Sequence, residues 1–96
     1  MKVFAIATIP QPLTPEQRQQ YLPSEVPHTL KLYLEGKIEQ FWFREAGGPI
    51  FLMNVESVDE AKAVLAAMPI VAGGIATYDV MPVGPLMPLG FLLQGK

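Results

Sequence analysis

The chain has 96 residues, half of them hydrophobic, and carries a net charge of −2 with no cysteine. This length corresponds to one small domain, and the lack of cysteine excludes disulfides, thiolate metal sites and cysteine nucleophiles. The seven Lys and Arg side chains are scattered, so no basic stripe is available to neutralise the phosphates of a nucleic acid.

The first predicted element is a strand over residues 3–9, which is apolar on both faces, as expected for a strand covered on two sides. Thr14 follows as a helix N-cap, with Pro15 at the first helical position. Gln17, three residues after the cap, completes a capping box. These residues predict that a helix begins at Pro15.

Pro23 is expected to end this first helix, because proline removes a backbone donor from a helix interior. Ser24 is then expected to cap a second segment over residues 25–35, with Gly36 as its C-terminal cap. Hydrophobic spacing predicts that one stripe of this segment faces the sheet. The stripe consists of Val26, Leu30, Tyr33 and Leu34.

Two strands and a tight turn come next. Residues 37–44 and 50–55 are rich in aromatic and β-branched side chains, and residues 45–49 between them contain Gly47 and Gly48. Paired glycines between two such runs are typical of a β-hairpin. This stretch therefore predicts an antiparallel pair of strands.

A second helix is predicted from Ser57, which begins a capping box with Glu60, to Met68. Pro69 is expected to stop it. Residues 70–74 are interpreted as a glycine-bearing connector, and residues 75–81 as the last strand because they alternate and are β-branched.

This order of elements predicts a ferredoxin-like βαββαβ sandwich of the α+β class, with a four-stranded antiparallel sheet and two helices on one face. The strands carry apolar residues on both faces, so we expect two sheets to stack face to face as a dimeric α/β barrel. The domain is assigned to residues 1–83. Residues 84–96, proline-rich and apolar, are interpreted as an arm laid on a neighbouring subunit.

Several segments resemble the muconolactone delta-isomerase-like group of dimeric α/β barrel proteins. They are the aromatic strand with Trp42 and Arg44, the helix start Leu22-Pro23-Ser24-Glu25, and the segments 34–37, 55–57, 68–70 and 83–86. The resemblance spans nearly the whole chain. It implies a small cofactor-free homo-oligomer, with a reaction of isomerase or related proton-transfer type on a small carboxylate or lactone.

Other chemistries are disfavoured by what the sequence contains. Both serines are expected at helix N-caps, where the hydroxyl is occupied, and the paired glycines lack the spacing of a phosphate-binding loop. One histidine with dispersed carboxylates offers no pair of metal ligands, so no metal site is expected.

Glu25 and His28 remain as a candidate catalytic pair, since residues three apart are neighbours on one helix face. A double-bond isomerase needs a base that takes a proton from carbon and a donor for the developing enolate. Glu25 is the candidate base, with His28 as its acid or orienting partner and Tyr33 or Tyr78 as the donor. The alternative is structural: an acidic residue in a first helical turn and a surface histidine.

Three further residues are candidates for substrate binding. Arg44 could hold a carboxylate through its guanidinium fork, Trp42 could form the wall of a pocket, and Asn54 is the polar residue of an apolar strand. Their alternatives are a solvent-exposed arginine, a tryptophan in the barrel core and an asparagine paired with backbone.

The expected partners are further copies of the chain and a small-molecule substrate, without nucleic acid, membrane or cofactor. The longest uncharged runs, residues 63–78 and 80–94, are shorter than a membrane span, and the first residues lack a signal-peptide pattern. These features predict a cytoplasmic protein. The alternative to an enzyme is a non-catalytic oligomeric protein that binds a ligand or supports assembly.

Overall fold

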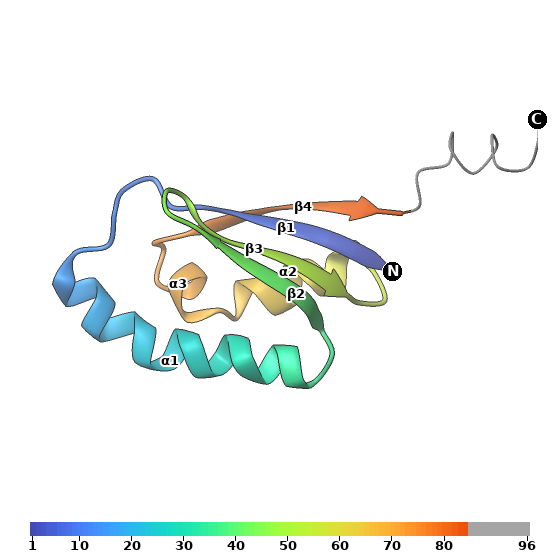
Figure 1. Cartoon of the computed structure of the whole chain (residues 1–96), viewed down its shortest axis with the longest axis horizontal. Coiled ribbons are helices and arrows are strands. Elements are labelled where there is room, and N and C mark those ends of the chain that lie inside the picture. Colours follow the sequence, from blue (N-terminus) through green and yellow to red (C-terminus); the bar gives the residue numbers. More distant parts are fainter. Residues whose placement is uncertain (85–96) are drawn as a thin grey trace, which may run out of the picture.

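The structure, a computed structural model, describes residues 1–84 and has the α+β class, with all described helices on one face of a four-stranded sheet (Figure 1). The strands lie in the order β2-β3-β1-β4, and each neighbouring pair is antiparallel. The elements are β1 (Lys2–Thr8), α1 (Pro15–Leu34), β2 (Ile38–Arg44), β3 (Gly48–Asn54), α2 (Val58–Ala66), α3 (Pro69–Ala72) and β4 (Thr77–Val83). The predicted ferredoxin-like fold is confirmed. Apart from Gly84, the predicted C-terminal arm lies outside the described residues.

Side chains alternate between the two faces of the sheet. On β1, Val3 and Ala5 are fully buried, whereas Phe4 and Ile6 between and beside them are only partly buried. The buried face packs against the helices and forms one hydrophobic core. Its members are Val3, Ala5, Leu32, Ile38, Phe51, Met53, Val55, Ala61, Leu65 and Met68.

Helix α1 runs unbroken across Pro23 and Pro27, so the predicted break at Pro23 is wrong. Each proline frees the carbonyl four residues earlier, which weakens the helix unless another partner is found. These carbonyls belong to Gln19 and Pro23, both solvent-exposed residues, so water can satisfy them. Ser24 is not an N-cap, because its hydroxyl donates to the Tyr21 carbonyl at 3.1 Å.

Both ends of α1 form as predicted. The Thr14 hydroxyl accepts from the Gln17 N–H at 3.1 Å, and the Gln17 side chain accepts from the Thr14 N–H at 3.0 Å. Gly36 has a φ of 83°, and the N–H groups of Gly36 and Lys37 donate back to carbonyls of the last turn. This pattern closes the helix and directs the chain into β2.

The face of α1 that packs against the protein differs from the predicted one. The four predicted residues, Val26, Leu30, Tyr33 and Leu34, are between 42% and 75% exposed. The buried residues of α1 are Glu25 and Leu32, which lie roughly 130° around the helix from the centre of that stripe at 3.6 residues per turn. Hydrophobic spacing identifies the most apolar face of α1. The face that packs against the protein is instead that of Glu25, whose carboxylate accepts a hydrogen bond from Ile70.

Helix α2 begins at the predicted cap: the Ser57 hydroxyl accepts from the Glu60 N–H at 3.0 Å. The Glu60 carboxylate reaches back to the Glu56 N–H, also at 3.0 Å, one residue before the cap. The helix ends at Ala66, and Pro69 begins the short helix α3 where a connector was predicted. The fixed φ of proline suits the first helical position, which explains why this segment coils rather than extends.

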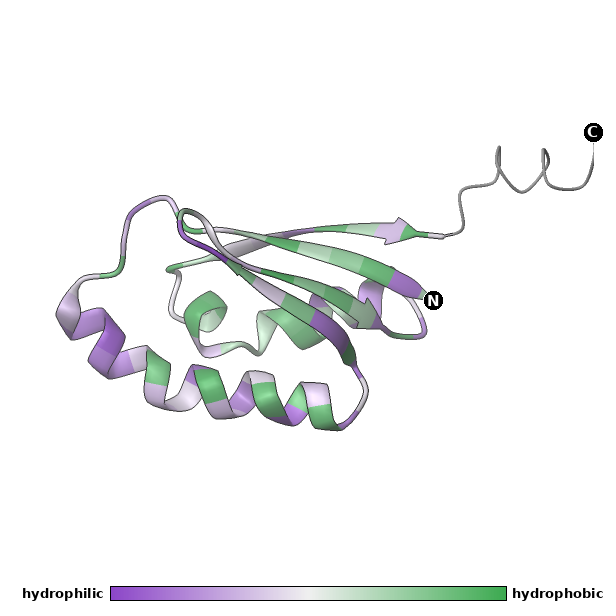
Figure 2. Cartoon of the chain, viewed as in Figure 1, coloured by the Kyte–Doolittle hydropathy of each residue, from purple (hydrophilic) through white to green (hydrophobic). Residues whose placement is uncertain are grey.

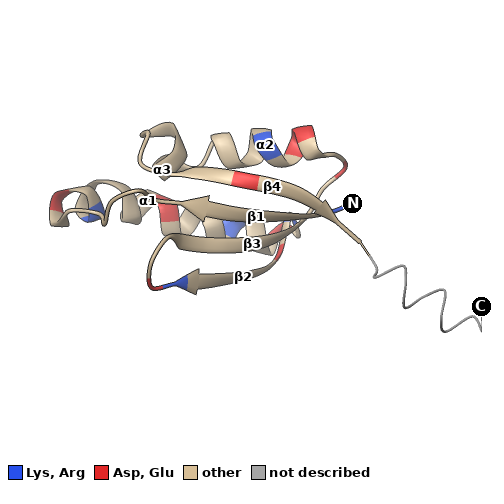
Figure 3. Ribbon diagram, turned by 90° about the horizontal axis from the view of Figure 1, so that it is seen from above, with Lys and Arg blue, Asp and Glu red and all other residues tan. Residues whose placement is uncertain are grey.

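The strands are largely hydrophobic (Figure 2), and their register places large apolar side chains on the sheet face opposite the helices. Phe4, Ile6, Ile50 and Leu52 are partly buried there, and Trp42 packs edge-on against Phe4 with ring centroids 6.1 Å apart. Charges are sparse on the strands (Figure 3). No described element covers this face in the single chain.

We expect alanine at Gly48 to destabilise the fold more than alanine at Gly36. Both glycines have positive φ, which costs an alanine about 1–2 kcal/mol. A Cβ at Gly48 would also lie 2.6 Å from Cδ1 of Ile9, whereas nothing lies within 4 Å of a Cβ at Gly36. Urea denaturation of both variants measures the difference, which overpacking predicts at roughly 1 kcal/mol or more. An equal loss of unfolding free energy in the two variants would show that the side chain of Ile9 moves aside at little cost.

Candidate functional site

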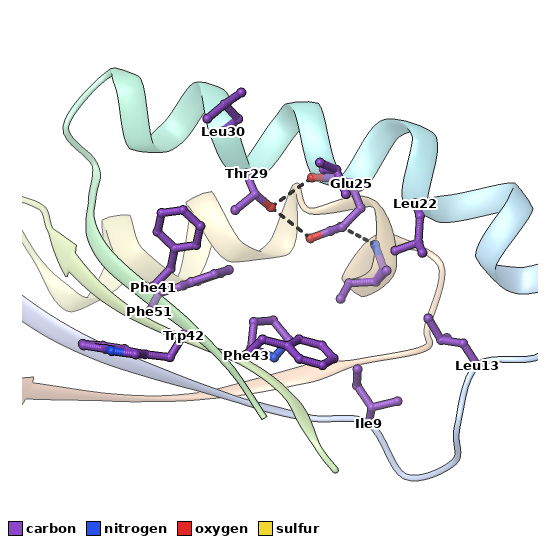
Figure 4. Close-up of a pocket in the computed structure, with 13 residues that line it drawn as sticks. Ile9, Leu13, Leu22, Glu25, Thr29, Leu30, Phe41, Trp42, Phe43 and Phe51 are labelled. Atoms are coloured by element: carbon purple, nitrogen blue, oxygen red, sulfur yellow. Dashed lines mark hydrogen bonds between the residues drawn. The ribbon is translucent and has the colours of Figure 1, made fainter. Parts of the chain in front are cut away.

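A pocket of about 520 Å³ opens between α1 and the β2 edge of the sheet (Figure 4). Thirteen residues line it, and only Glu25 and Thr29 among them are polar. The others are Ile9, Leu13, Leu22, Val26, Leu30, Phe41, Trp42, Phe43, Pro49, Phe51 and Ile70. The pocket is therefore an apolar cavity with one carboxyl group.

The aromatic wall comes from β2 and β3. The strand register places Phe41 opposite Phe51 and Phe43 opposite Pro49, so these side chains share the face that looks toward the helices. Because β2 is an edge strand and α1 stands beside it, Phe41 remains 47% exposed and Phe43 79% exposed. Exposed rings at the mouth of a cavity are suited to holding a flat ligand.

Glu25 is the buried charged residue of the described chain, with 7% of its surface exposed. Its Oε1 accepts from the backbone N–H of Ile70 at 3.1 Å, which joins α1 to α3 (Figure 4). Burial raises the pKa of the Glu25 carboxyl, and the Ile70 hydrogen bond, the charge of His28 and the Thr29 hydroxyl oppose that rise more weakly. The carboxyl is thus more easily protonated than an exposed glutamate.

Thr29 lies one turn after Glu25 and contacts it twice. Its hydroxyl donates to the Glu25 backbone carbonyl at 2.9 Å and lies 3.4 Å from the carboxylate Oε2. One hydroxyl proton cannot serve both oxygens, and the shorter contact is the one to the carbonyl. A proton on Oε2 would turn the longer contact into a second hydrogen bond, so this geometry also accommodates the neutral carboxyl.

Tyr78 on β4 stacks against Phe51, with ring centroids 5.5 Å apart and an interplanar angle of 23°. Its hydroxyl oxygen is buried and has no hydrogen-bond partner among the described residues. Burial, and next the charge of Glu25, raise the pKa of Tyr78, so the phenol keeps its proton across the physiological range. The structure therefore places an unused donor within electrostatic reach of Glu25.

His28 and Tyr33 lie on α1 but do not line the pocket. His28 is partly buried and acts on Glu25 through its charge, while the hydrogen bonds to the carboxylate come from Ile70 and Thr29. Tyr33 packs edge-on against Phe41 with ring centroids 5.1 Å apart, behind the aromatic wall.

Arg44 and Asn54 lie outside the pocket lining. The Arg44 guanidinium donates to three backbone carbonyls: that of Gly48 through Nε at 3.1 Å, that of Gly47 through Nη2 at 2.9 Å, and that of Ala7. It therefore fastens the hairpin to β1. Asn54 is exposed at the end of β3.

Of the residues proposed from the sequence, Glu25 and Trp42 line the pocket. Sequence reasoning missed Thr29, Phe41 and Phe43. The spacing of Glu25 and Thr29, four residues apart on one helix face, was a visible signal. The run Phe41-Trp42-Phe43 was also visible, but the strand order and register were needed to show that Phe41 and Phe43 face the helices and the cavity.

Residues 1–84 hold no cluster of three or more His, Cys, Asp or Glu side chains arranged to bind a metal ion. None of the helices in this part of the chain combines the length and hydrophobicity that a bilayer crossing requires.

No protein-family model and no curated protein sequence matches the chain. Its fold is similar to that of two solved enzymes. Muconolactone isomerase is 18% identical with a TM-score of 0.73, and the match covers 88% of this chain and 90% of that one. The second is the 5-chloro-2-hydroxyhydroquinone dehydrochlorinase TftG from Burkholderia phenoliruptrix AC1100, in complex with 2,5-dihydroxybenzoquinone. It is 17% identical with a TM-score of 0.67, and the match covers 85% of this chain and 93% of that one. The resemblance inferred from the sequence is therefore confirmed at the level of the fold.

Proposed function

We propose that the protein is a cofactor-independent proton-transfer enzyme of isomerase type, which acts on a small carboxylate or lactone in the pocket beside α1. The observation that carries the proposal is the buried carboxyl of Glu25, whose pKa is raised, in an otherwise apolar cavity. A titratable group perturbed by burial inside a cleft is a common property of catalytic acids and bases. Glu25 would serve as the general base.

The proposed reaction moves one proton. The Glu25 carboxylate takes a proton from a carbon next to the conjugated system, and the electron pair of that bond passes into an enolate. The neutral carboxyl then returns the proton to another carbon, which shifts the double bond. A raised pKa favours this role, because a stronger base removes the proton more readily and the carboxyl holds it until transfer.

A hydrogen-bond donor is needed where negative charge develops on the enolate oxygen. The Tyr78 hydroxyl keeps its proton and has no partner among the described residues, but it is buried and outside the pocket lining, so this role requires the Tyr78 ring to turn toward the ligand. His28, whose charge lowers the Glu25 pKa, is proposed to tune the base rather than to exchange protons with the substrate.

The two solved enzymes of similar fold agree with this class of chemistry. One is named an isomerase and the other a dehydrochlorinase. A double-bond shift and a loss of hydrogen chloride can both begin when a base removes a proton from carbon. At 17–18% identity, this agreement supports a reaction class and not a substrate.

A non-catalytic ligand-binding protein is the second candidate. It is favoured by the lining of the pocket, in which eleven of the thirteen residues are apolar. Such a cavity can hold a ligand without reacting with it. The two functions differ in whether Glu25 removes a proton from what is bound.

We expect the wild-type protein to accelerate hydrogen–deuterium exchange and double-bond migration in the neutral lactone 5-methyl-2(5H)-furanone, followed by NMR in heavy water. Glu25→Gln should lower the rate by about 10²–10⁴-fold, the usual contribution of a general base. The rate should rise with pH as Glu25 ionises, with a midpoint above its ordinary value of 4.5 because burial raises the pKa.

Glu35→Gln is the matched control, since Glu35 is an exposed glutamate at the end of the same helix. It should leave the rate and the pH profile unchanged. Exchange at the solvent rate in the wild type, with binding still visible in Trp42 fluorescence, would favour the non-catalytic protein.

We also propose that the chain forms a dimer in which the open sheet faces of two copies pack against each other. The support is its partly buried Phe4, Ile6, Ile50 and Leu52 beside the 46% exposed Trp42, which a monomer leaves in contact with water. In a twofold-symmetric dimer the same apolar face of both chains forms the interface, so each face removes the other from water.

Light scattering at micromolar concentration should therefore give at least twice the mass of one chain. Leu52→Lys, in the centre of this face, should shift the protein toward monomer, whereas Leu34→Lys on the exposed side of α1 should not. A stable wild-type monomer would rule out the stacked arrangement.

A further inference from the structure

We infer that the pocket selects uncharged ring compounds, such as lactones and cyclic enones, over ligands that carry a carboxylate or another anionic group. The inference builds on the proposed use of this pocket as the reaction site and narrows its substrate class. Of the two substrate types proposed from the sequence, a small carboxylate and a lactone, it favours the uncharged lactone.

The first support is the charge in the pocket. Glu25 is the ionisable group among the lining residues, and it becomes negative when it is ready to act as a base. An anion bound beside it would be repelled, and apolar surroundings screen that repulsion poorly. A neutral ligand meets no such penalty in either protonation state of Glu25.

The second support is the use of Arg44. This side chain was the candidate clamp for a carboxylate, yet its Nε and Nη2 donate to backbone carbonyls at the hairpin. A bidentate grip through that side of the guanidinium would require those hydrogen bonds to break. Arg44 is also outside the lining of the pocket, whose thirteen residues include neither Lys nor Arg.

The third support is the match between the walls and a flat, weakly polar ligand. Phe41, Phe43 and Phe51 present aromatic surface, and a volume of about 520 Å³ is within the ordinary range for small-molecule sites. Glu25 and Thr29 supply polar atoms on one side only. This arrangement suits a ring with one carbonyl edge and an apolar remainder.

The test compares two fluorescent probes with the same ring skeleton. N-phenyl-1-naphthylamine is neutral, and 1-anilinonaphthalene-8-sulfonate carries one negative charge. At pH 8 we expect the full-length wild-type protein to bind the neutral probe at least tenfold more tightly. Equal or tighter binding of the anionic probe, or no binding of either, would overturn the inference.

Two variants locate the selectivity in this pocket. Glu25→Gln removes the negative charge with little change in shape, and Val26→Lys adds a positive charge at a lining position that is 61% exposed. Each should reduce the preference for the neutral probe at least threefold. Glu35→Gln and Leu34→Lys are the matched controls, on the same helix and outside the lining, and should leave the preference unchanged.

Val26→Lys keeps the test decisive if Glu25→Gln is poorly folded, because an exposed helix position tolerates lysine. A preference that neither variant alters would mean that the probes bind elsewhere, which contradicts the inference. A clear preference for the neutral probe without any exchange of lactone protons would instead support the charge selectivity while the proposed catalysis fails.

Discussion

The hydrogen bond from the Ile70 N–H to the Glu25 carboxylate, together with the burial of Leu32, holds one face of α1 against the protein. It joins residues 45 positions apart and links α1 to α3. With Glu25 turned inward, the apolar side chains Val26 and Leu30 point away from the core and stand beside the aromatic edge of β2. The pocket exists because the helix is held by a polar contact on one face while its apolar face remains open.

The burial of the Glu25 carboxyl affects both the stability of the fold and the reactivity of this group. Placing a carboxyl among apolar side chains raises its pKa and disfavours its charged form, which costs free energy of folding at neutral pH. The Ile70 N–H offsets part of this cost because it stabilises the carboxylate. A carboxyl with a raised pKa holds a proton more readily than an exposed glutamate, which suits a group that must accept a proton and return it. Tyr78, with its raised pKa and buried hydroxyl, lies outside the pocket lining but within electrostatic reach of Glu25.

Local signals predicted the parts of the fold that depend on local interactions. The capping boxes at Thr14 and Ser57, the positive φ of Gly36 and the Gly47-Gly48 turn each involve residues close in sequence. The unbroken α1 was not predicted, because the carbonyls that its prolines free belong to exposed residues and can bond to water. Its buried face was not predictable from spacing, because the hydrogen bond from Ile70 to Glu25 joins residues 45 positions apart. Glu25 was identified as a candidate base, but the aromatic walls of its pocket required the strand order and register.

The central claim is that Glu25 is a buried carboxyl with a raised pKa in a ligand pocket. The most direct measurement is an NMR titration of the full-length protein labelled with ¹³C at the glutamate side-chain carboxyl. The account predicts that the Glu25 resonance titrates above its ordinary value of 4.5, because burial raises the pKa of this carboxyl. A neutral ligand in the pocket should shift it further upward. Titration of Glu25 at or below 4.5 would contradict the account.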